Sequence, residues 1–98
     1  MLPSTLAIVE AIRSVPFGKV SCYRDIALAA GLSNGARQVV RTLHSLSEKE
    51  KLPWHRIIRA EGRIAPGSGS RELQAALLRA EGVAVSKDGR VDMGKYRI

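Results

Sequence analysis

The side chains best suited to binding or reaction lie together in the segment Pro53–Ile58, which reads Pro-Trp-His-Arg-Ile-Ile. Trp54 is the only tryptophan of the chain, and its indole offers an N–H donor and a flat face for stacking. Proline has a fixed φ and no N–H, so Pro53 favours a turn or the start of a strand, and the two isoleucines favour a short buried strand after it. Taken alone, the segment is more typical of a core tryptophan between surface charges than of a binding site.

Nucleophilic and metal chemistry have little support elsewhere in the sequence. Cys22 has no histidine near it in the chain, and a catalytic thiol needs a base held against it, so we expect a small packed side chain. Cys22, His44 and His55 lack the spacing of a metal site, and neither a phosphate-binding glycine motif nor a pair of catalytic carboxylates is present. We therefore expect no metal and no cofactor. The remaining arginine, tyrosine, tryptophan and histidine residues suit a protein that grips nucleic acid and stacks on bases.

The charge balance favours a polyanionic partner. The 98 residues contain 16 Lys and Arg against nine Asp and Glu, which gives a net charge of +7, and most of the cations are arginines, which suit bidentate contacts to phosphate or guanine. A single cysteine excludes an internal disulfide framework and fits a reducing cytosol. No apolar run approaches the roughly 20 residues of a membrane span, and the N-terminus lacks the features of a signal peptide. We expect one domain over residues 1–98, a cytoplasmic location (at the nucleoid in a bacterium) and no membrane partner.

The first half of the chain has the pattern of a helix-turn-helix. A first helix is expected to be capped by Ser4 and to end before Gly18. Ser21 is the expected cap of a second helix that ends at Gly31, and a tight turn then leads to a third helix over residues 35–46. The apolar stripe of the first helix contains Leu6, Ile8, Val9 and Ile12.

The third helix divides its residues between two faces. At 100° per residue the apolar face contains Val39, Leu43 and Leu46, and the opposite face contains Arg37, Arg41 and His44. A solvated basic face is the plainer interpretation, and some helix-turn-helix units bind no DNA. Together with the net charge, the basic face favours binding to DNA.

The second half combines a helix with turns. The charge run 48–51 is expected to be a solvated connector, and the loop 66–70 has many free backbone N–H groups and little side-chain bulk. A fourth helix is expected over Arg71–Ala80. Asp88-Gly89 is a strong hairpin signal, flanked by Val83-Ala84-Val85 and Arg90-Val91-Asp92. The sequence therefore predicts a winged helix-turn-helix domain that is mainly α with short β elements.

Three segments resemble the C-terminal domain of the O6-alkylguanine-DNA alkyltransferases: Gly18–Tyr23, Ala36–Val40 and Pro53–Ile58, in the same order and at similar separations. Repair enzymes of that family have a cysteine directly before the histidine and accept the alkyl group on its sulfur, whereas this chain has Trp54 there. Short freestanding domains with that replacement are the alkyltransferase-like proteins, and this chain is similar to them throughout. Because indole has no thiolate, alkyl transfer to position 54 is not expected.

The resemblance implies docking in the minor groove and flipping of a nucleotide into a pocket. Arg37 matches the arginine that enters the base stack in place of the extruded nucleotide, and Tyr23 matches the tyrosine that crowds the phosphate of the target. Unstacking costs a few kcal/mol and less for a damaged pair. Arg41 and Ser21 are further expected DNA contacts, Ser21 as a helix cap beside the backbone. The residues expected to line or brace the lesion pocket are Pro53, Trp54, His55, Arg56, Gly67 and Ser68, with the loop 66–70 covering the base.

Two departures from the family pattern are expected. The register carried back from Leu77-Leu78 places the carboxylate that backs His55 near Ala75, so the relay that activates the cysteine should be incomplete. Alkyltransferase-like relatives can place an arginine in the pocket loop, where the simplest register here gives Gly67. Arg63 or Arg71 could reach in from either side, and the preferred lesion is left open.

The resemblance as a whole implies a monomeric, non-enzymatic sensor of alkylated guanine in duplex DNA that flags the lesion for nucleotide excision repair proteins. One alternative is a winged-helix transcription regulator that reads sequence through Arg37 and Arg41 and binds a single undamaged site. Another is an alkyltransferase that uses Cys22 and gains the mass of one alkyl group from O6-methylguanine DNA.

Overall fold

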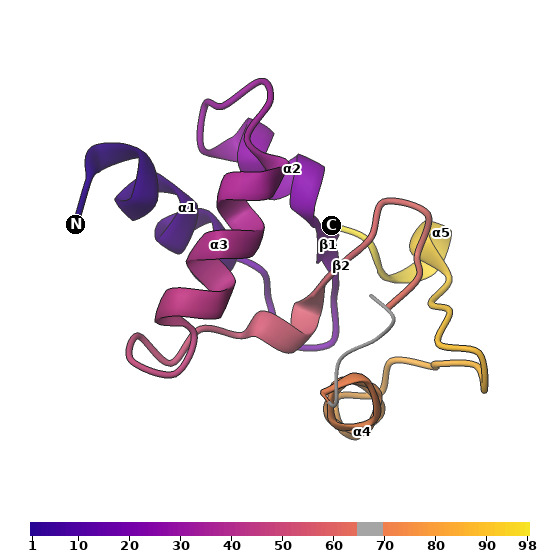
Figure 1. Cartoon of the computed structure of the whole chain (residues 1–98). Coiled ribbons are helices and arrows are strands. Elements are labelled where there is room, and N and C mark those ends of the chain that lie inside the picture. The colour runs from indigo at the N-terminus through magenta and orange to yellow at the C-terminus, as the bar shows by residue number, and fades with distance from the viewer. Residues whose placement is uncertain (65–69) are drawn as a thin grey trace.

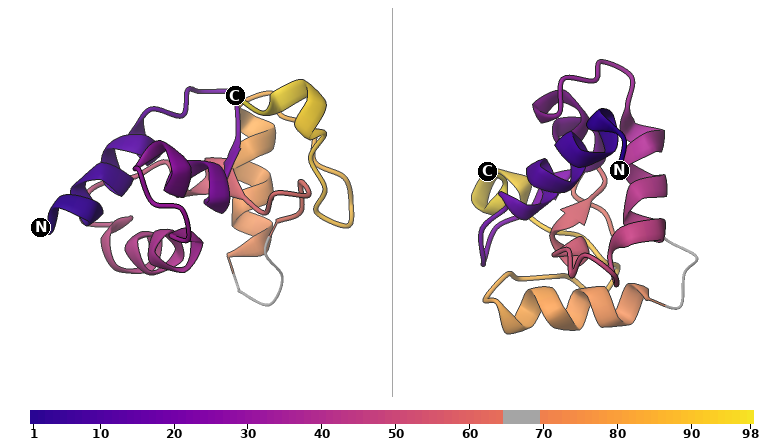
Figure 2. Two further views of the ribbon diagram at one scale, coloured as in Figure 1. Left: turned by 90° about the horizontal axis from the view of Figure 1, so that it is seen from above. Right: turned by 90° about the vertical axis from the view of Figure 1, so that its left-hand side faces the viewer.

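The computed structural model describes residues 1–64 and 70–98, which are mainly helical. In chain order the elements are α1 (Pro3–Arg13), β1 (Ser21–Cys22), α2 (Tyr23–Ala29), α3 (Ala36–Leu46), the 3-10 helix η1 (Trp54–Arg56), β2 (Ile57–Ile58), α4 (Arg71–Ala80) and α5 (Met93–Tyr96). Helices α1, α2 and α3 lie on one side of the molecule, α4 and α5 lie on the other, and the two strands lie between them (Figure 1, Figure 2). The expected fold class, mainly α with short β elements, is confirmed. Within the described ranges, no helix has the length and apolarity to cross a membrane.

The helix-turn-helix forms as the sequence predicts. Gly31 follows α2 with a φ of +82°, a conformation that suits glycine. Gly35 lies against the turn so closely that an added Cβ would be 2.7 Å from the Cβ of Leu32. Helix α3 then buries Val39, while Arg37 and Arg41 are exposed on its other side. The tight turn therefore sets α3 across α2 with its basic face outward.

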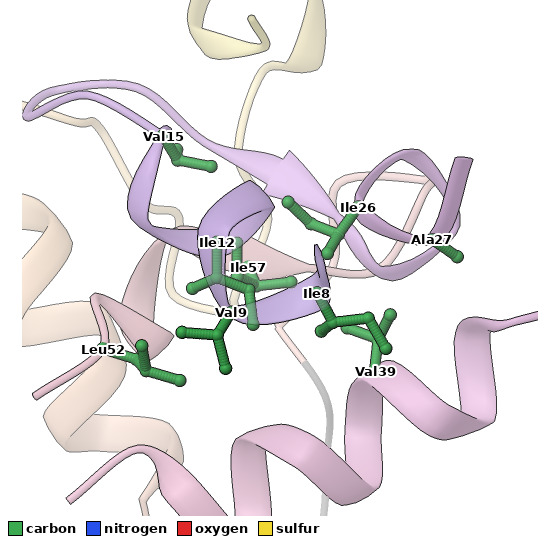
Figure 3. Packing of buried hydrophobic residues seen from close by; sticks show 9 residues of the cluster. All are labelled: Ile8, Val9, Ile12, Val15, Ile26, Ala27, Val39, Leu52 and Ile57. Atoms are coloured by element: carbon green, nitrogen blue, oxygen red, sulfur yellow. The ribbon is translucent and has the colours of Figure 1, made fainter. Parts of the chain in front are cut away.

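The helix-turn-helix and α1 enclose a first hydrophobic core (Figure 3). Its buried members are Ile8, Val9, Ile12, Val15, Ile26, Ala27, Val39, Leu52 and Ile57. Leu43 and Leu46 of α3 pack against it from the rim, as their spacing predicts. Leu6 is the exception in the expected apolar stripe, because this residue is 45% exposed.

Neither expected serine cap forms. Helix α1 begins at Pro3, a favourable first helical residue because it needs no N–H partner there. The hydroxyl of Ser4 instead accepts a hydrogen bond from Gln38 Nε2 at 2.9 Å and thereby joins α1 to α3. Ser21 lies in β1 and is 2% exposed, and Cys22 occupies the cap position of α2 without a side-chain cap.

A second core lies under α4 and the C-terminal segment. Its buried members are Val20, Ile58, Ile64, Ala75, Leu78, Val83, Val91 and Tyr96. Strands β1 and β2 run parallel between the two cores, with Ser21 opposite Ile57 and Cys22 opposite Ile58. Since successive side chains of a strand point to opposite faces, Ile57 enters the first core and Ile58 enters the second.

The expected hairpin around Asp88-Gly89 is wrong in its strands, although the turn itself exists. Gly89 has a φ of +77°, and its N–H donates to the carbonyl of Ser86 at 3.0 Å. The guanidinium of Arg79 donates to the carbonyls of Val85 at 2.8 Å and Ser86 at 3.4 Å, so these acceptors bond to α4 instead of to a strand partner. The chain then forms α5, whose first turn is capped by Asp92 through the N–H of Gly94.

Candidate nucleic-acid interface

A cleft of about 970 Å³ lies between the C-terminal half of α3, η1 and the start of α4. Its lining residues are Tyr23, Val40, Leu43, His44, Ser47, Glu48, Lys51, Leu52, Trp54, Ile57, Arg59, Ser70 and Gln74. Trp54 is half-buried and lines this cleft. Among these described residues, six are aromatic or aliphatic and seven are polar or charged, so the cleft offers both apolar faces and hydrogen-bonding groups to a ligand.

The position of Trp54 is set by η1 and by Gln74 of α4. Pro53 precedes the single turn of η1, and the ring of Trp54 meets that of His55 edge to face, with 6.1 Å between centroids. Gln74 is 6% exposed, and its Nε2 donates to the carbonyls of His55 and Ile57 at 3.1 Å each. A buried carbonyl without a partner is costly, so Gln74 stabilises the backbone within η1 and directly after it, next to Trp54.

His55 and Arg56 share one carboxylate behind the cleft. Nε2 of His55 lies 2.5 Å from Oε2 of Glu81, and the guanidinium of Arg56 donates to both oxygens of Glu81 at 2.9–3.1 Å. The backbone N–H of Gly18 donates to Glu81 at 2.8 Å, and Arg56 also donates to the carbonyl of Val15. This Glu81 network joins the end of α4 to η1 and to the connection between α1 and β1.

The carboxylate expected near Ala75 is therefore at Glu81. Ala75 is buried on α4 in the second core and offers His55 no polar group. The expectation of an incomplete relay is wrong, because His55 has a carboxylate partner. The register failed because the partner follows α4, after the Leu77-Leu78 pair from which it was counted back.

Two pKa values in this region are displaced. Burial alone would raise the pKa of Glu81, but the hydrogen bonds from Arg56, Gly18 and His55 outweigh it and lower the pKa to about 2. Burial raises the pKa of the Tyr23 phenol, against a smaller lowering by the positive charge of Arg59. Glu81 is thus a fixed negative charge behind the cleft, and Tyr23 is a neutral hydrogen-bonding group at its wall.

The family model described as "6-O-methylguanine DNA methyltransferase, DNA binding domain" matches residues 3–83. A DNA base-flipping protein of Vibrio parahaemolyticus is 40% identical over 90 residues, which are 92% of this chain and 90% of that protein. Alkyltransferase-like protein 1 of Schizosaccharomyces pombe is 32% identical over 93% of this chain and 83% of that protein. The chain belongs to the alkyltransferase-like proteins.

Solved structures agree with this assignment. The crystal structure of S. pombe Atl1 in complex with damaged DNA containing O6-carboxymethylguanine is similar with a TM-score of 0.90, at 29% identity, over 100% of this chain and 96% of that one. The O6-methylguanine methyltransferase of Mycobacterium tuberculosis matches with a TM-score of 0.65, at 26% identity, and covers 79% of this chain and 47% of its own. This alkyltransferase-like chain therefore shares its fold with both the DNA-bound relative and the enzyme.

The expected site residues divide into those at the cleft and those behind it. Trp54 and Tyr23 line the cleft, whereas His55 and Arg56 are absent from its lining and brace η1 from behind through Glu81. Pro53 lies at the start of η1. The predicted pocket residues Gly67 and Ser68, with the rest of the segment 65–69, lie outside the described residues.

The expected DNA contacts also divide. Arg37 and Arg41 are exposed on α3. Ser21, at 2% exposure in β1, presents no surface to DNA in this conformation, so its expected role is not carried forward. Neither Arg63 nor Arg71 lines the cleft, and Arg71 donates to the carbonyl of Asp88 at 2.8 Å.

Three residues at or behind the cleft were missed by sequence reasoning. Gln74, Glu81 and Arg59 come from α4, its C-terminus and the turn after β2. Gln74 carries a detectable signal, because it is a polar residue on the face of α4 that also buries Ala75 and Leu78. Glu81 carries a weaker signal, because Glu81-Gly82 continues the likeness to the family after Leu77-Leu78, but its distance in the chain from His55 hides the contact. Arg59 has no such signal, because most of the residues with which it lines the cleft are distant in the chain. Among the described residues no group of His, Cys, Asp and Glu could hold a metal ion.

Proposed function

We propose that this alkyltransferase-like chain binds duplex DNA that contains an alkylated guanine, flips the damaged nucleotide into the cleft beside Trp54, and does not accept the alkyl group. The single observation that supports this most strongly is the cleft itself, which is lined by the indole of Trp54. The family resemblance places the acceptor cysteine of the related enzymes at that position. An indole face can stack on a flipped base and its N–H can donate a hydrogen bond. Binding is therefore reversible.

The absence of alkyl transfer depends on Trp54 alone. Cys22, the single thiol of the chain, is fully buried in the strand β1 and is not among the residues that line the cleft. His55 keeps its carboxylate in Glu81, so the histidine is still oriented as a base would be, without a nucleophile beside it. In this proposal the Glu81 network has a structural role, which is to hold η1 and its tryptophan in place.

Helix α3 supplies the docking surface in this proposal. Arg37 and Arg41 are exposed near its start and middle, and the C-terminal half of the same helix forms a wall of the cleft. A helix that lies in the minor groove could thus present an arginine to the base stack and the cleft to the extruded nucleotide. The solved complex of the S. pombe relative with damaged DNA supports the binding of such DNA by this fold, and the docking in the minor groove rests on the family resemblance.

We further propose that the bound protein acts as a cytoplasmic monomer and marks the lesion for nucleotide excision repair proteins. This part rests on the family resemblance. A pull-down with lesion-bound protein tests it, and a repair protein retained equally on undamaged duplex would contradict it.

A fluorescence titration tests the central proposal. Trp54 is the only tryptophan, so its emission reports on the cleft. Two duplexes of one sequence, one plain and one with O6-methylguanine, should differ in affinity, with the damaged duplex bound more tightly and the Trp54 emission quenched by stacking. The protein mass should be unchanged after incubation. Equal affinities, tight binding of one undamaged sequence, or a methyl adduct on the protein would each overturn the proposal.

A further inference from the structure

Arg59 is the one arginine among the described residues that line the cleft. It follows β2 directly, and its backbone is fixed by two hydrogen bonds: its N–H donates to the carbonyl of Arg63 at 3.0 Å, and its carbonyl accepts from the N–H of Gly62 at 2.9 Å. Gly62 has a φ of +88°, and a Cβ there would lie 2.5 Å from the carbonyl oxygen of Val91. The turn is therefore held tightly against the second core, and Arg59 starts from a rigid position.

The guanidinium of Arg59 is weakly engaged. Its nearest carboxylate in the described part of the chain is that of Glu61, at 3.9 Å, and the two side chains are 46% and 63% exposed. An exposed ion pair at that distance contributes little free energy. Arg56 is the opposite case, with both oxygens of a buried carboxylate bound. The donors of Arg59 can thus engage a ligand at small cost.

The surroundings of Arg59 favour an anion. Tyr23 lies close enough for the positive charge of Arg59 to lower the pKa of its phenol against the effect of burial. Lys51 and Arg59 are cations of the lining, and Glu48 is its one carboxylate among the described residues. At about 970 Å³ the cleft is near the upper end of the range for small-molecule sites, roughly 300–1,000 Å³, so a base leaves space for a substituent.

We infer that Arg59 determines lesion specificity by binding a carboxylate at the end of the O6 substituent, so that the cleft prefers anionic adducts to neutral adducts of similar size. The inference rests on the proposed function, since it needs a flipped guanine beside Trp54. Guanidinium and carboxylate form two parallel, charge-assisted hydrogen bonds, a geometry that a lysine ammonium does not reproduce. The phosphate of the flipped nucleotide is the competing anion, and the experiment must separate it from the adduct.

The test compares three duplexes of one sequence at fixed ionic strength: plain, with O6-methylguanine, and with O6-carboxymethylguanine. Arg59→Gln removes the charge and Arg59→Lys keeps it without the planar fork. Arg90→Gln is the matched control, because Arg90 is also exposed, pairs with the carboxylate of Asp88 at 3.4 Å, and lies outside the cleft. Thermal unfolding of each variant checks that the fold is retained.

We expect Arg59→Gln to weaken binding of the carboxymethyl duplex at least about tenfold relative to the methyl duplex, because the glutamine amide can replace the two charge-assisted hydrogen bonds by one neutral hydrogen bond at most. Arg59→Lys should lose part of that preference, and Arg90→Gln should keep all of it. An equal loss on the methyl and carboxymethyl duplexes would assign Arg59 to the phosphate and overturn the inference, as would no loss at all. If the wild type does not prefer methylated to plain duplex, the proposed function itself fails, a result distinct from either of these.

Discussion

At position 54 an aromatic ring faces a cleft while the neighbouring histidine points away from it to a buried carboxylate. The two side chains are adjacent in sequence, yet they serve different surfaces because η1 turns the chain between them. Trp54 is therefore a binding group, and His55 is a positioning residue for it. This separation of roles would be hard to infer from the tripeptide alone, in which both residues look equally accessible.

We predict that Arg37 contributes more to the affinity for damaged DNA than its positive charge alone explains. Replacing Arg37 by alanine should weaken binding to the O6-methylguanine duplex by about 1 kcal/mol or more, the scale of contacts that support flipping. Lys87→Ala removes one exposed positive charge that lies outside both α3 and the cleft lining, and serves as the control for net charge. The measurement is the Trp54 titration on both duplexes. If Arg37→Ala and Lys87→Ala have equal effects, Arg37 is a solvated surface charge.

The Glu81 network connects several secondary-structure elements, because one carboxylate joins α4, η1 and the connection after α1. The side chain of Glu81 is 8% exposed, so its bonds are made largely out of water. Helix α4 thereby fixes the cleft from two points: Gln74 holds the backbone of η1 at one end and Glu81 holds its side chains at the other.

The network makes a prediction about acid stability. The folded pKa of Glu81, about 2, is below its ordinary value of 4.5, so its contribution is fully present above pH 4.5 and is lost as the pH falls toward 2. The shift corresponds to roughly 3 kcal/mol of the free energy of unfolding. Urea unfolding of the wild type between pH 7 and pH 2.5 should show this loss.

Variants of α4 provide the comparison. Glu81→Gln should be destabilised at pH 7 and should have a flatter profile below pH 4.5, because the amide does not titrate. Glu72→Gln, on the exposed face of the same helix, should keep the wild-type profile. Parallel profiles for the wild type and Glu81→Gln would show that another group causes the acid sensitivity.

Sequence reasoning succeeded where an element is defined by its own periodicity. Helices α2, α3 and α4 fall in the expected positions, because their apolar spacing and their flanking glycines are local. It failed where long-range bonds decide. The residues on either side of Asp88-Gly89 resemble strands in sequence. In the structure, Arg79 donates hydrogen bonds to the carbonyls of Val85 and Ser86, and the hydroxyl of Tyr96 accepts one from the N–H of Ala84. Glu81 was missed for the same reason, because it is 26 residues from the histidine that it holds.

For the molecule as a whole, the net charge of +7 predicts that salt weakens binding to every duplex. Release of counterions from the phosphates is independent of the lesion. Raising the salt from about 50 to about 200 mM should lower the affinities for plain and O6-methylguanine duplexes by a similar factor. Their ratio should hold, because the flipped methylated base is neutral. A ratio that collapses in salt would mean that the preference is electrostatic and does not come from the cleft.

The two adjacent isoleucines of β2 point into different cores, Ile57 toward the helix-turn-helix and Ile58 toward α4 and the C-terminal segment. Ile57 lines the cleft and is bonded directly to Ile58, which belongs to the second core. A ligand in the cleft that restricts the motion of Ile57 should therefore slow amide hydrogen exchange around both hydrophobic cores. Occupation of the cleft would then change the dynamics around α4 and the C-terminal segment, where a partner protein could detect it without contacting the lesion.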